Sequence, residues 1–450
     1  MPPINRDHLE SLMQSEQEKF ASARPKSKSL FTRAGKSLLS GVPMNWMAKW
    51  AGSFPPFVTE AHGAEVIDVD SHRYIDFCLG DTAAMTGHSP PPTVSAAQSQ
   101  LASGISLMLP SEDAVWVAEE LQRRFRLPYW QFALTATDAN RFSIRLARHI
   151  TRRQKILVFN WCYHGTVDES FITLKDGVSR PRAGNIGPPV DPSLTTKVVE
   201  FNDLPALAQA LQPGDVACVL AEPALTNVGI VHPAPDYHRQ LRELTRKYKT
   251  LLIIDETHTI CAGPGGFTRA ENLDPDFLVF GKAIGAGIPG AAYGFTEEVA
   301  NAISAGMNLE DCDVGGIGGT LAGNALSLAA MRATLDKVLT EEAFTRMIPL
   351  AERWTLGVKQ AITKFQILWH VTRLGCRAEY LFAPNPPRNG TEAHNAMDFD
   401  LERFMHLFAM NRGILLTPFH NMALMSPATT PAHVDRHTEV FSEAVQALIS

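Results

Sequence analysis

The chain has 450 residues, enough for a large hydrophobic core and more than one domain. Hydrophobic residues make up 45%, charged residues 20%, and the formal net charge is -6, as in ordinary globular proteins. No dense Lys/Arg cluster predicts a nucleic-acid surface, and no apolar run is long enough to cross a bilayer. The polar first twenty residues predict an N-terminal amphipathic helix or arm, not a signal peptide. We therefore expect a cytoplasmic protein whose partners are small molecules, not nucleic acid or membrane.

The cysteines are spread along the chain without any CxxC pair, and no HExxH motif is present. We expect reduced thiols and no zinc site. The six residues are Cys78, Cys162, Cys218, Cys261, Cys312 and Cys376.

In chain order, residues 65–77 alternate apolar and polar side chains around Asp70-Ser71 and predict an antiparallel hairpin. From about residue 110, amphipathic helical patterns such as 113–125 and 237–249 alternate with short apolar runs. These runs predict buried strands over 155–160, 217–223, 250–257 and 277–282.

After residue 320 helical patterns dominate, with a strand over 377–382 and a terminal helix over 434–449. Residues 383–395 read as a surface loop. The pattern predicts a large α/β domain with a mostly parallel sheet and a smaller α+β domain built from both chain ends. We expect the arm and part of the small domain in 1–80, the large domain in 81–335, and the rest of the small domain in 336–450.

Three polar residues follow predicted strands: Glu222, Asp255 and Lys282. In parallel sheets, ligands bind at the carboxyl ends of the strands. Each residue alone is compatible with a satisfied polar group at a strand end, but the three together indicate a site.

Lys282 ends an apolar strand and precedes several glycines. A neutral lysine amine can attack a carbonyl, which suggests a Schiff base. Asp255 is either a plain ion-pair partner of this lysine or the carboxylate that keeps the ring nitrogen of pyridoxal phosphate protonated.

A phosphate cup is predicted where Thr135, Ala136 and Thr137 precede an amphipathic helix, with Asp138 in its first turn. A helix N-terminus binds phosphate well, although an ordinary helix cap explains the same residues. A second candidate is 315–324, where Gly319-Thr320 is predicted to open a helix. Tyr163 and His164 follow a strand and offer an aromatic cover for a flat ring, or simple loop packing.

The motifs "YHG", "AEP", "IIDE", "FGKAIGAGIPGAAYG" and "GTLAGNALSLAA" occur in order. Together they resemble the fold-type I pyridoxal-phosphate enzymes, and more narrowly the class III aminotransferases or omega-transaminases. Within that family the chain most resembles the glutamate-1-semialdehyde aminomutase and beta-amino-acid transaminase branch. The likeness extends from residue 65 to the C-terminal helix.

The resemblance implies a homodimer, or a pair of dimers, with the active site at the subunit interface. It makes Lys282 the Schiff-base lysine and proton shuttle, and Asp255 the partner of the pyridine nitrogen. It also implies further cofactor-binding residues: Thr135, Ala136 and Thr137 in the phosphate loop, Tyr163 stacked on the ring, His164, Glu222, His258, and Thr320 at the phosphate of the partner subunit's cofactor.

Departures from the family pattern affect the same site. Ala136 stands where the family usually has glycine, and an alanine is unfavourable if the loop needs a positive φ. Thr257 replaces the usual valine. His258 follows at a position that lies near the cofactor's phenolic oxygen in several relatives. Our hypothesis is that it forms a hydrogen bond there, and the alternative is a loop histidine that faces elsewhere.

The substrate side is less defined. Relatives hold a carboxylate with an arginine in the N-terminal segment, but residues 40–50 contain none. Trp46 and its neighbours could line an apolar pocket or belong to the core. Arg377 is an alternative carboxylate anchor, and His420 a candidate for the pocket rim. Asn227 stands where ornithine-type relatives have a gating glutamate.

Our main expectation for the reaction is a ping-pong transaminase that uses an amine or beta-amino acid and a keto acid. A glutamate-1-semialdehyde-type aminomutase, a lyase or racemase, and a non-catalytic cofactor binder remain alternatives. Residues 285–290 also satisfy GxGxxG, so a nicotinamide (NAD) oxidoreductase is a rival from another class. The extended pattern after residue 290 disfavours it, since that fingerprint needs a helix there.

Overall fold

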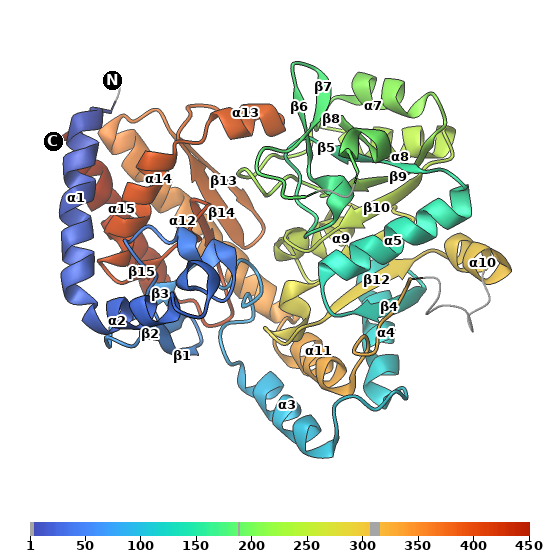
Figure 1. The fold of residues 1–450 in the computed structure, drawn as a ribbon, viewed down its shortest axis with the longest axis horizontal. Coiled ribbons are helices and arrows are strands. Elements are labelled where there is room, and N and C mark those ends of the chain that lie inside the picture. Colours follow the sequence, from blue (N-terminus) through green and yellow to red (C-terminus); the bar gives the residue numbers. More distant parts are fainter. Residues whose placement is uncertain (1–3, 188–189, 307–315) are drawn as a thin grey trace. The chain divides into compact units, whose positions relative to one another are not determined.

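The computed structural model describes residues 4–187, 190–306 and 316–450, which form two compact units (Figure 1). The sheet unit comprises Pro91–Glu341 and Pro387–Asn395, and the terminal unit comprises Met1–Pro90, Glu342–Pro386 and Ala396–Ser450. We expected limits near residues 80 and 335. In the structure the boundaries between the two units lie after residues 90 and 341, and the later segment Pro387–Asn395 belongs to the sheet unit again.

A seven-stranded sheet with the order β4-β12-β11-β10-β9-β5-β8 forms the centre of the sheet unit. Strand β12 is antiparallel to both of its neighbours, and the pairs from β11 through β8 are parallel. The fold class is therefore the expected α/β type with a mostly parallel sheet, and the four apolar runs are strands as predicted. The bounds are β4 Tyr129–Ala133, β5 Lys155–Phe159, β8 Thr196–Val199, β9 Val216–Ala221, β10 Leu251–Asp255, β11 Phe277–Phe280 and β12 Ala291–Phe295.

Helix α5 packs against five strands of this sheet, and α8 packs on β10 (Figure 1). The buried face of α5 includes Ala139, Ile144 and Ala147, which recur at helical spacing and remove apolar surface from water. The helices of the unit are α3 Pro91–Ser103, α4 Glu112–Phe125, α5 Ala136–Thr151, α6 Pro192–Thr195, α7 Leu204–Leu211, α8 Tyr237–Lys247, α9 Gly266–Ala270, α10 Glu297–Gly306, α11 Ala325–Lys337 and α13 Gly390–Asn395; a small hairpin joins β6 Ile172–Lys175 to β7 Val178–Pro181.

Two local expectations were wrong. Thr320 does not open a helix: it lies in a turn, and α11 begins at Ala325, capped by the side chain of Asn324. Gly323, between Thr320 and Ala325, has φ of +66°, a conformation that interrupts helical hydrogen bonding. Residues 390–395 are helix α13 rather than surface loop: Asn389 Oδ1 accepts from the Glu392 N–H at 2.9 Å, and Asn160 donates to the Thr391 hydroxyl at 3.0 Å.

Strand β12 is followed by only one residue before α10, and the glycines at 285–290 precede a strand rather than a helix. This order excludes the strand–glycine–helix unit that a nicotinamide site of the GxGxxG type requires.

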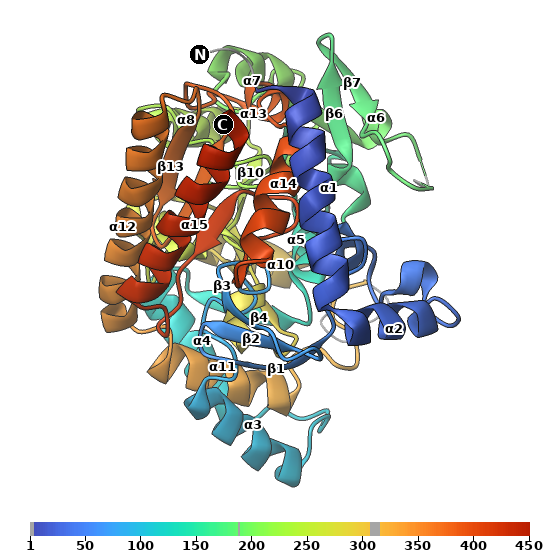
Figure 2. The ribbon, with the colours of Figure 1, turned by 90° about the vertical axis from the view of Figure 1, so that its left-hand side faces the viewer.

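The terminal unit contains two small sheets with the orders β1-β2-β3-β15 and β13-β14-β16. The hairpin expected over 65–77 is confirmed, since β2 and β3 pair antiparallel. Figure 2 shows α1 alongside α14, a pair that is in contact. The bounds are α1 Arg6–Ala23, α2 Pro25–Ala34, β1 Val58–His62, β2 Glu65–Asp68, β3 Arg73–Asp76, α12 Glu341–Phe365, β13 His370–Leu374, β14 Arg377–Leu381, α14 Phe399–Met410, β15 Ile414–Leu415, β16 Met422–Leu424 and α15 Pro431–Ile449.

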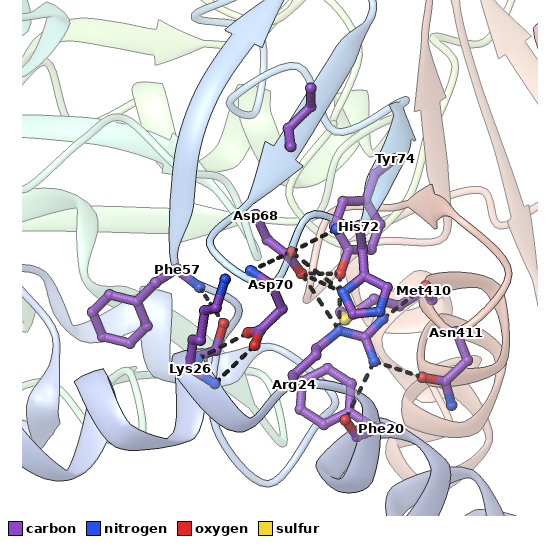
Figure 3. Close-up of polar contacts among 12 residues, drawn as sticks. Phe20, Arg24, Lys26, Phe57, Asp68, Asp70, His72, Tyr74, Met410 and Asn411 are labelled. Atoms are coloured by element: carbon purple, nitrogen blue, oxygen red, sulfur yellow. Dashed lines mark hydrogen bonds and ion pairs between the residues drawn. The ribbon is translucent and has the colours of Figure 1, made fainter.

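A buried polar network joins α1, the hairpin and α14 (Figure 3). Arg24 Nε donates to the Tyr74 hydroxyl at 2.8 Å, and this hydroxyl donates to Asp68 Oδ2 at 2.6 Å. The Arg24 guanidinium also donates to Asn411 Oδ1 at 3.2 Å. Buried charges are tolerated when they are paired and hydrogen-bonded, so this network links the N-terminal helices to the C-terminal part of the chain.

Within the residues described, no helix is both long and apolar enough to span a membrane. The five described cysteines are buried and form no disulfide; Cys312 lies outside the described residues.

Candidate active site

Polar residues meet at the carboxyl edge of the central sheet because neighbouring strands end there. Asp255 is the last residue of β10 and pairs across the sheet with Val279 of β11, the next strand. Lys282 follows β11, and Glu222 follows β9 on the other side of β10. The expected grouping of these three residues is therefore present.

Four donors hold the Asp255 carboxylate. Oδ2 accepts hydrogen bonds from Asn140 Nδ2 at 2.8 Å and His164 Nδ1 at 2.9 Å. Oδ1 accepts from the Thr257 backbone N–H at 3.0 Å and from the Thr257 hydroxyl at 2.6 Å. A carboxylate has about four lone-pair sites, so each of them already has a donor.

Asp255 and His164 form a buried ion pair. Burial acts to raise the pKa of Asp255, but the bond and charge of His164, with Thr257 and Asn140, hold it below its ordinary value. Burial acts to lower the pKa of His164, and Cys162 and Asp255 raise it to about 10. The carboxylate is therefore negatively charged over the physiological range.

Lys282 has φ of +49°, and its Nζ lies 2.9 Å from His258 Nε2. The residue before it, Gly281, lies close to the start of α5. A Cβ added at Gly281 would lie 3.2 Å from the backbone nitrogen of Ala136 and 3.3 Å from the Cβ of Ala136. The lysine and the helix N-terminus are thus neighbours.

The expected phosphate loop is the first turn of α5. Thr135 is the N-cap, and its Oγ1 accepts from the Asp138 N–H at 3.2 Å, while Ala136 and Thr137 are already helical. Ala136 has no positive φ, so this backbone does not need glycine there. Thr137 Oγ1 accepts from the Thr166 N–H at 3.0 Å, which ties the turn to the loop after β5.

Glu222 holds the loop after β5, which carries Tyr163. The Tyr163 ring is 37% exposed at the carboxyl edge of the sheet. Glu222 Oε1 accepts from the Tyr163 backbone N–H at 3.2 Å, and Oε2 accepts from the N–H and hydroxyl of Thr226. Burial raises the pKa of Glu222, which fits a carboxyl group that positions this loop.

Thr320 is exposed in the turn before α11, on the segment that leads into this helix. The structure does not bring it into the hydrogen-bonded group around Asp255. The remaining expected residues belong to the terminal unit.

Trp46 lies in the short helix η2 (Asn45–Lys49), with its ring edge-on to Phe419 at 5.7 Å between centroids. Arg377 is 1% exposed and donates to Glu379 at 2.8 Å, and His420 Nδ1 lies 3.1 Å from the same carboxylate. Arg377 and His420 are thus brought together on Glu379.

Sequence reasoning missed Asn140 and Glu256. Asn140 is fully buried on the sheet-facing side of α5, and a polar residue within that apolar stripe is the signal that could have revealed it. Glu256 accepts from Thr259 Oγ1 at 2.5 Å and from the Phe267 N–H at 3.1 Å, so it braces the loop after β10.

Known proteins match this architecture. A family model described as aminotransferase class-III matches residues 46–445. The glutamate-1-semialdehyde 2,1-aminomutase of Neisseria meningitidis serogroup C / serotype 2a is 31% identical over 434 residues, covering 93% of this chain and 98% of that protein. An omega-transaminase structure from Sphaerobacter thermophilus aligns with a TM-score of 0.86 and 26% identity, covering 94% and 98% of the two chains.

The crystal structure of a glutamate-1-semialdehyde-aminomutase from Pseudomonas aeruginosa PAO1 aligns with a TM-score of 0.96 and 47% identity over 99% of each chain. A lysine-to-alanine variant of that protein was solved in complex with PMP. Because the family model matches most of the sequence, this chain belongs to the class III aminotransferases, and its cofactor is pyridoxal 5′-phosphate.

Proposed function

We propose that this protein is an aminomutase of the glutamate-1-semialdehyde type, which moves an amino group within one substrate by means of pyridoxal phosphate. The observation that carries the cofactor chemistry is the placement of Asp255 at the end of β10 and of Lys282 just after the adjacent parallel strand β11, where Gly281 lies against the N-terminus of α5. The relatives that are 31% and 47% identical both carry the aminomutase name, which favours this reaction over our main sequence-based expectation of a transaminase.

The charge at Asp255 fits the protonated ring nitrogen of the cofactor, because an anion raises the pKa of a nearby base. All four lone-pair sites of the Asp255 carboxylate already accept a hydrogen bond. A direct hydrogen bond from the ring nitrogen to Asp255 therefore requires one of the present donors to move away. The Thr257 hydroxyl is the candidate, since it can rotate about its Cα–Cβ bond while its backbone N–H stays in place.

The first turn of α5 fits a phosphate group. The N–H groups at a helix start have no acceptor within the helix, and the dipole adds positive potential. Thr135 uses only the Asp138 N–H. The negative charge of the Asp138 carboxylate repels a bound phosphate. This carboxylate accepts a hydrogen bond from Thr135 Oγ1 at 2.8 Å, which partly neutralises its charge.

When bound, the cofactor ring withdraws electrons from the carbon that bears the substrate's amino group. Lys282 Nζ is the group that takes a proton from this carbon and returns it. Asp255, held by His164 and Asn140, keeps its negative charge in a fixed place beneath the site. Tyr163, on a loop held by Glu222, is the proposed ring-stacking residue.

A homodimer is part of the proposal, with Thr320 reaching the partner's phosphate; its exposure is compatible with that role. The described cysteines are buried and form no disulfide, which is compatible with the cytoplasm, where thiols stay reduced.

A transaminase acting on an amine or beta-amino acid and a keto acid is the second candidate. One observation favours it: residues 40–50 lack the arginine that holds a carboxylate in the aminomutase branch. Arg377, the expected substitute, is fully buried against Glu379.

The test starts with the purified protein and glutamate-1-semialdehyde alone. We expect a visible absorption band that borohydride reduction removes, with the cofactor then attached to Lys282 in the peptide mass. We also expect the isomer with its amino group on the neighbouring carbon, formed without any keto acid. Product that appears only with an added amine and pyruvate would support the transaminase instead. A protein that stays colourless with pyridoxal phosphate would contradict both.

A further inference from the structure

The amine of Lys282 is in direct contact with an imidazole. Lys282 Nζ lies 2.9 Å from His258 Nε2, within the range of a good hydrogen bond. A neutral lysine amine has two N–H donors and one lone pair, and a neutral imidazole nitrogen without its proton accepts. When His258 carries its proton on Nδ1, Lys282 donates in this contact and His258 Nε2 accepts.

The sheet register produces this contact. Asp255 and Val279 are paired across β10 and β11, and the Glu256 N–H continues the pairing with a bond to the Val279 carbonyl at 2.7 Å. His258 lies three positions after Asp255 (258 − 255) and Lys282 three positions after Val279 (282 − 279). The two segments that carry His258 and Lys282 therefore leave the sheet from paired positions on adjacent strands.

The backbone around His258 is held from both sides. Thr257 is bound to Asp255 through its N–H and its hydroxyl. On the other side, the Ile260 N–H donates to the Glu256 carbonyl at 2.9 Å, and the buried Glu256 carboxylate binds Thr259. The imidazole therefore starts from a fixed Cα position.

The lysine backbone is equally constrained. Gly281 lies against Ala136, and Lys282 adopts a left-handed φ of +49°, which non-glycine residues adopt only where the surroundings impose it. Two fixed backbones that face each other make a preorganised pair.

We propose that His258 is a positioning residue that acts through Lys282, orienting its amine and accepting a proton from it as the lysine acts as a nucleophile. This inference rests on the proposed role of Lys282 and adds a partner for it. Histidine suits the task because its charge changes near neutral pH.

The proton balance is simple. When Nζ forms a bond to an electrophilic carbon, the nitrogen lone pair enters that bond and one N–H proton becomes acidic. His258 Nε2 takes that proton with its own lone pair and becomes an imidazolium. The leaving group of the electrophile departs with the electrons of its bond. No oxidant or reductant is needed.

The experiment uses the cofactor-free full-length protein and acetic anhydride at one neutral pH. The anhydride acetylates amines with loss of acetate, and peptide mass spectrometry follows the rate at Lys282. Lys197, which lies on β8 and donates to Asp215, is the internal reference amine. The proteins compared are the unsubstituted chain, His258→Gln, which keeps an acceptor but is no base, and His258→Ala, which leaves a space.

Because general-base assistance contributes about 10²- to 10⁴-fold, we expect acetylation at Lys282 to slow at least about tenfold in both variants. The rate at Lys197 should not change. Added imidazole should restore the Lys282 rate in His258→Ala, and a purely structural role for His258 would not give this rescue.

Equal Lys282 rates in all three proteins would overturn the inference. An unchanged rate in His258→Gln alone would also overturn the proton-accepting role, since a hydrogen-bond acceptor would then suffice. The assay contains neither cofactor nor substrate, so its failure leaves the proposed function standing. That function fails separately if the protein binds no pyridoxal phosphate.

Discussion

Gly165 offers a direct test of the proposed phosphate site at α5. It has φ of +72°, and a Cβ there would lie 2.1 Å from Thr137 Oγ1 and 3.0 Å from Thr137 Cβ. Gly165→Ala therefore forces the Thr137 side chain away and breaks its bond to the Thr166 N–H, with a shift of the helix start. Gly214 is the matched control, because its φ is +71° and a Cβ there would meet nothing within 4 Å.

Both substitutions place alanine in the left-handed region, which costs roughly 1–2 kcal/mol. The lost Thr137–Thr166 bond adds about 1 kcal/mol of destabilisation in Gly165→Ala only. If the shifted turn also loses one hydrogen bond to the phosphate, binding weakens by about 1.5–3 kcal/mol, because the acceptor is charged. That loss is about 10- to 100-fold in the dissociation constant.

The assay is equilibrium dialysis of pyridoxal phosphate against each variant in a Lys282→Ala background, which removes the covalent contribution. Thermal unfolding of the same proteins measures the stability difference. We expect weakened binding in Gly165→Ala and unchanged binding in Gly214→Ala. Equal affinities in the two variants would refute the assignment of the phosphate to this turn.

The remaining predictions concern the ion pairs and the hydroxyl described above. Thr257→Val should tighten noncovalent cofactor binding about fivefold in the same dialysis. The reason is that the cofactor no longer has to displace the Thr257 hydroxyl from Asp255, a hydrogen bond of about 1 kcal/mol. Weaker binding would contradict this prediction. The pKa of His164 is raised from 6.5 to about 10, so its stabilisation is complete below pH 6.5 and is lost as the pH rises through 10. The thermal midpoint of His164→Gln should therefore approach that of the unsubstituted protein at alkaline pH, and a constant difference would be the contrary result. Arg377→Met leaves the buried Glu379 carboxylate with only His420 as an ion-pair partner and should lower the free energy of unfolding by about 3–5 kcal/mol. The exposed-pair control Arg353→Met should change it by about 1 kcal/mol or less, and equal losses would be evidence against burial as the cause.

Local patterns were sufficient for the architecture. Apolar runs between amphipathic helices predicted the strands that became β5, β9, β10 and β11, because strand and helix periodicities are properties of a few neighbouring residues. Parallel strands end at one edge, so the polar residues that follow them were expected to meet. Lys282 and Asp255 could be singled out for that reason.

Short-range signals were less reliable where glycines or distant anchors decide the backbone. The start of α11 was expected at Thr320 and lies at Ala325, after Gly323, whose φ is +66°. Helix α13 was expected as loop although Asn389 caps it locally, and its contact with Asn160 joins residues 231 positions apart.

The partners within the site come from tertiary structure. Asn140 and Asp255 are 115 positions apart, His164 and Asp255 91 apart, and His258 and Lys282 24 apart. Each contact depends on strand order, register and the placement of α5, which no local pattern encodes. The sequence thus predicts which residues carry the chemistry and at which edge of the sheet they lie. The packing of the sheet determines which atoms touch, and therefore which groups hold a charge or accept a proton.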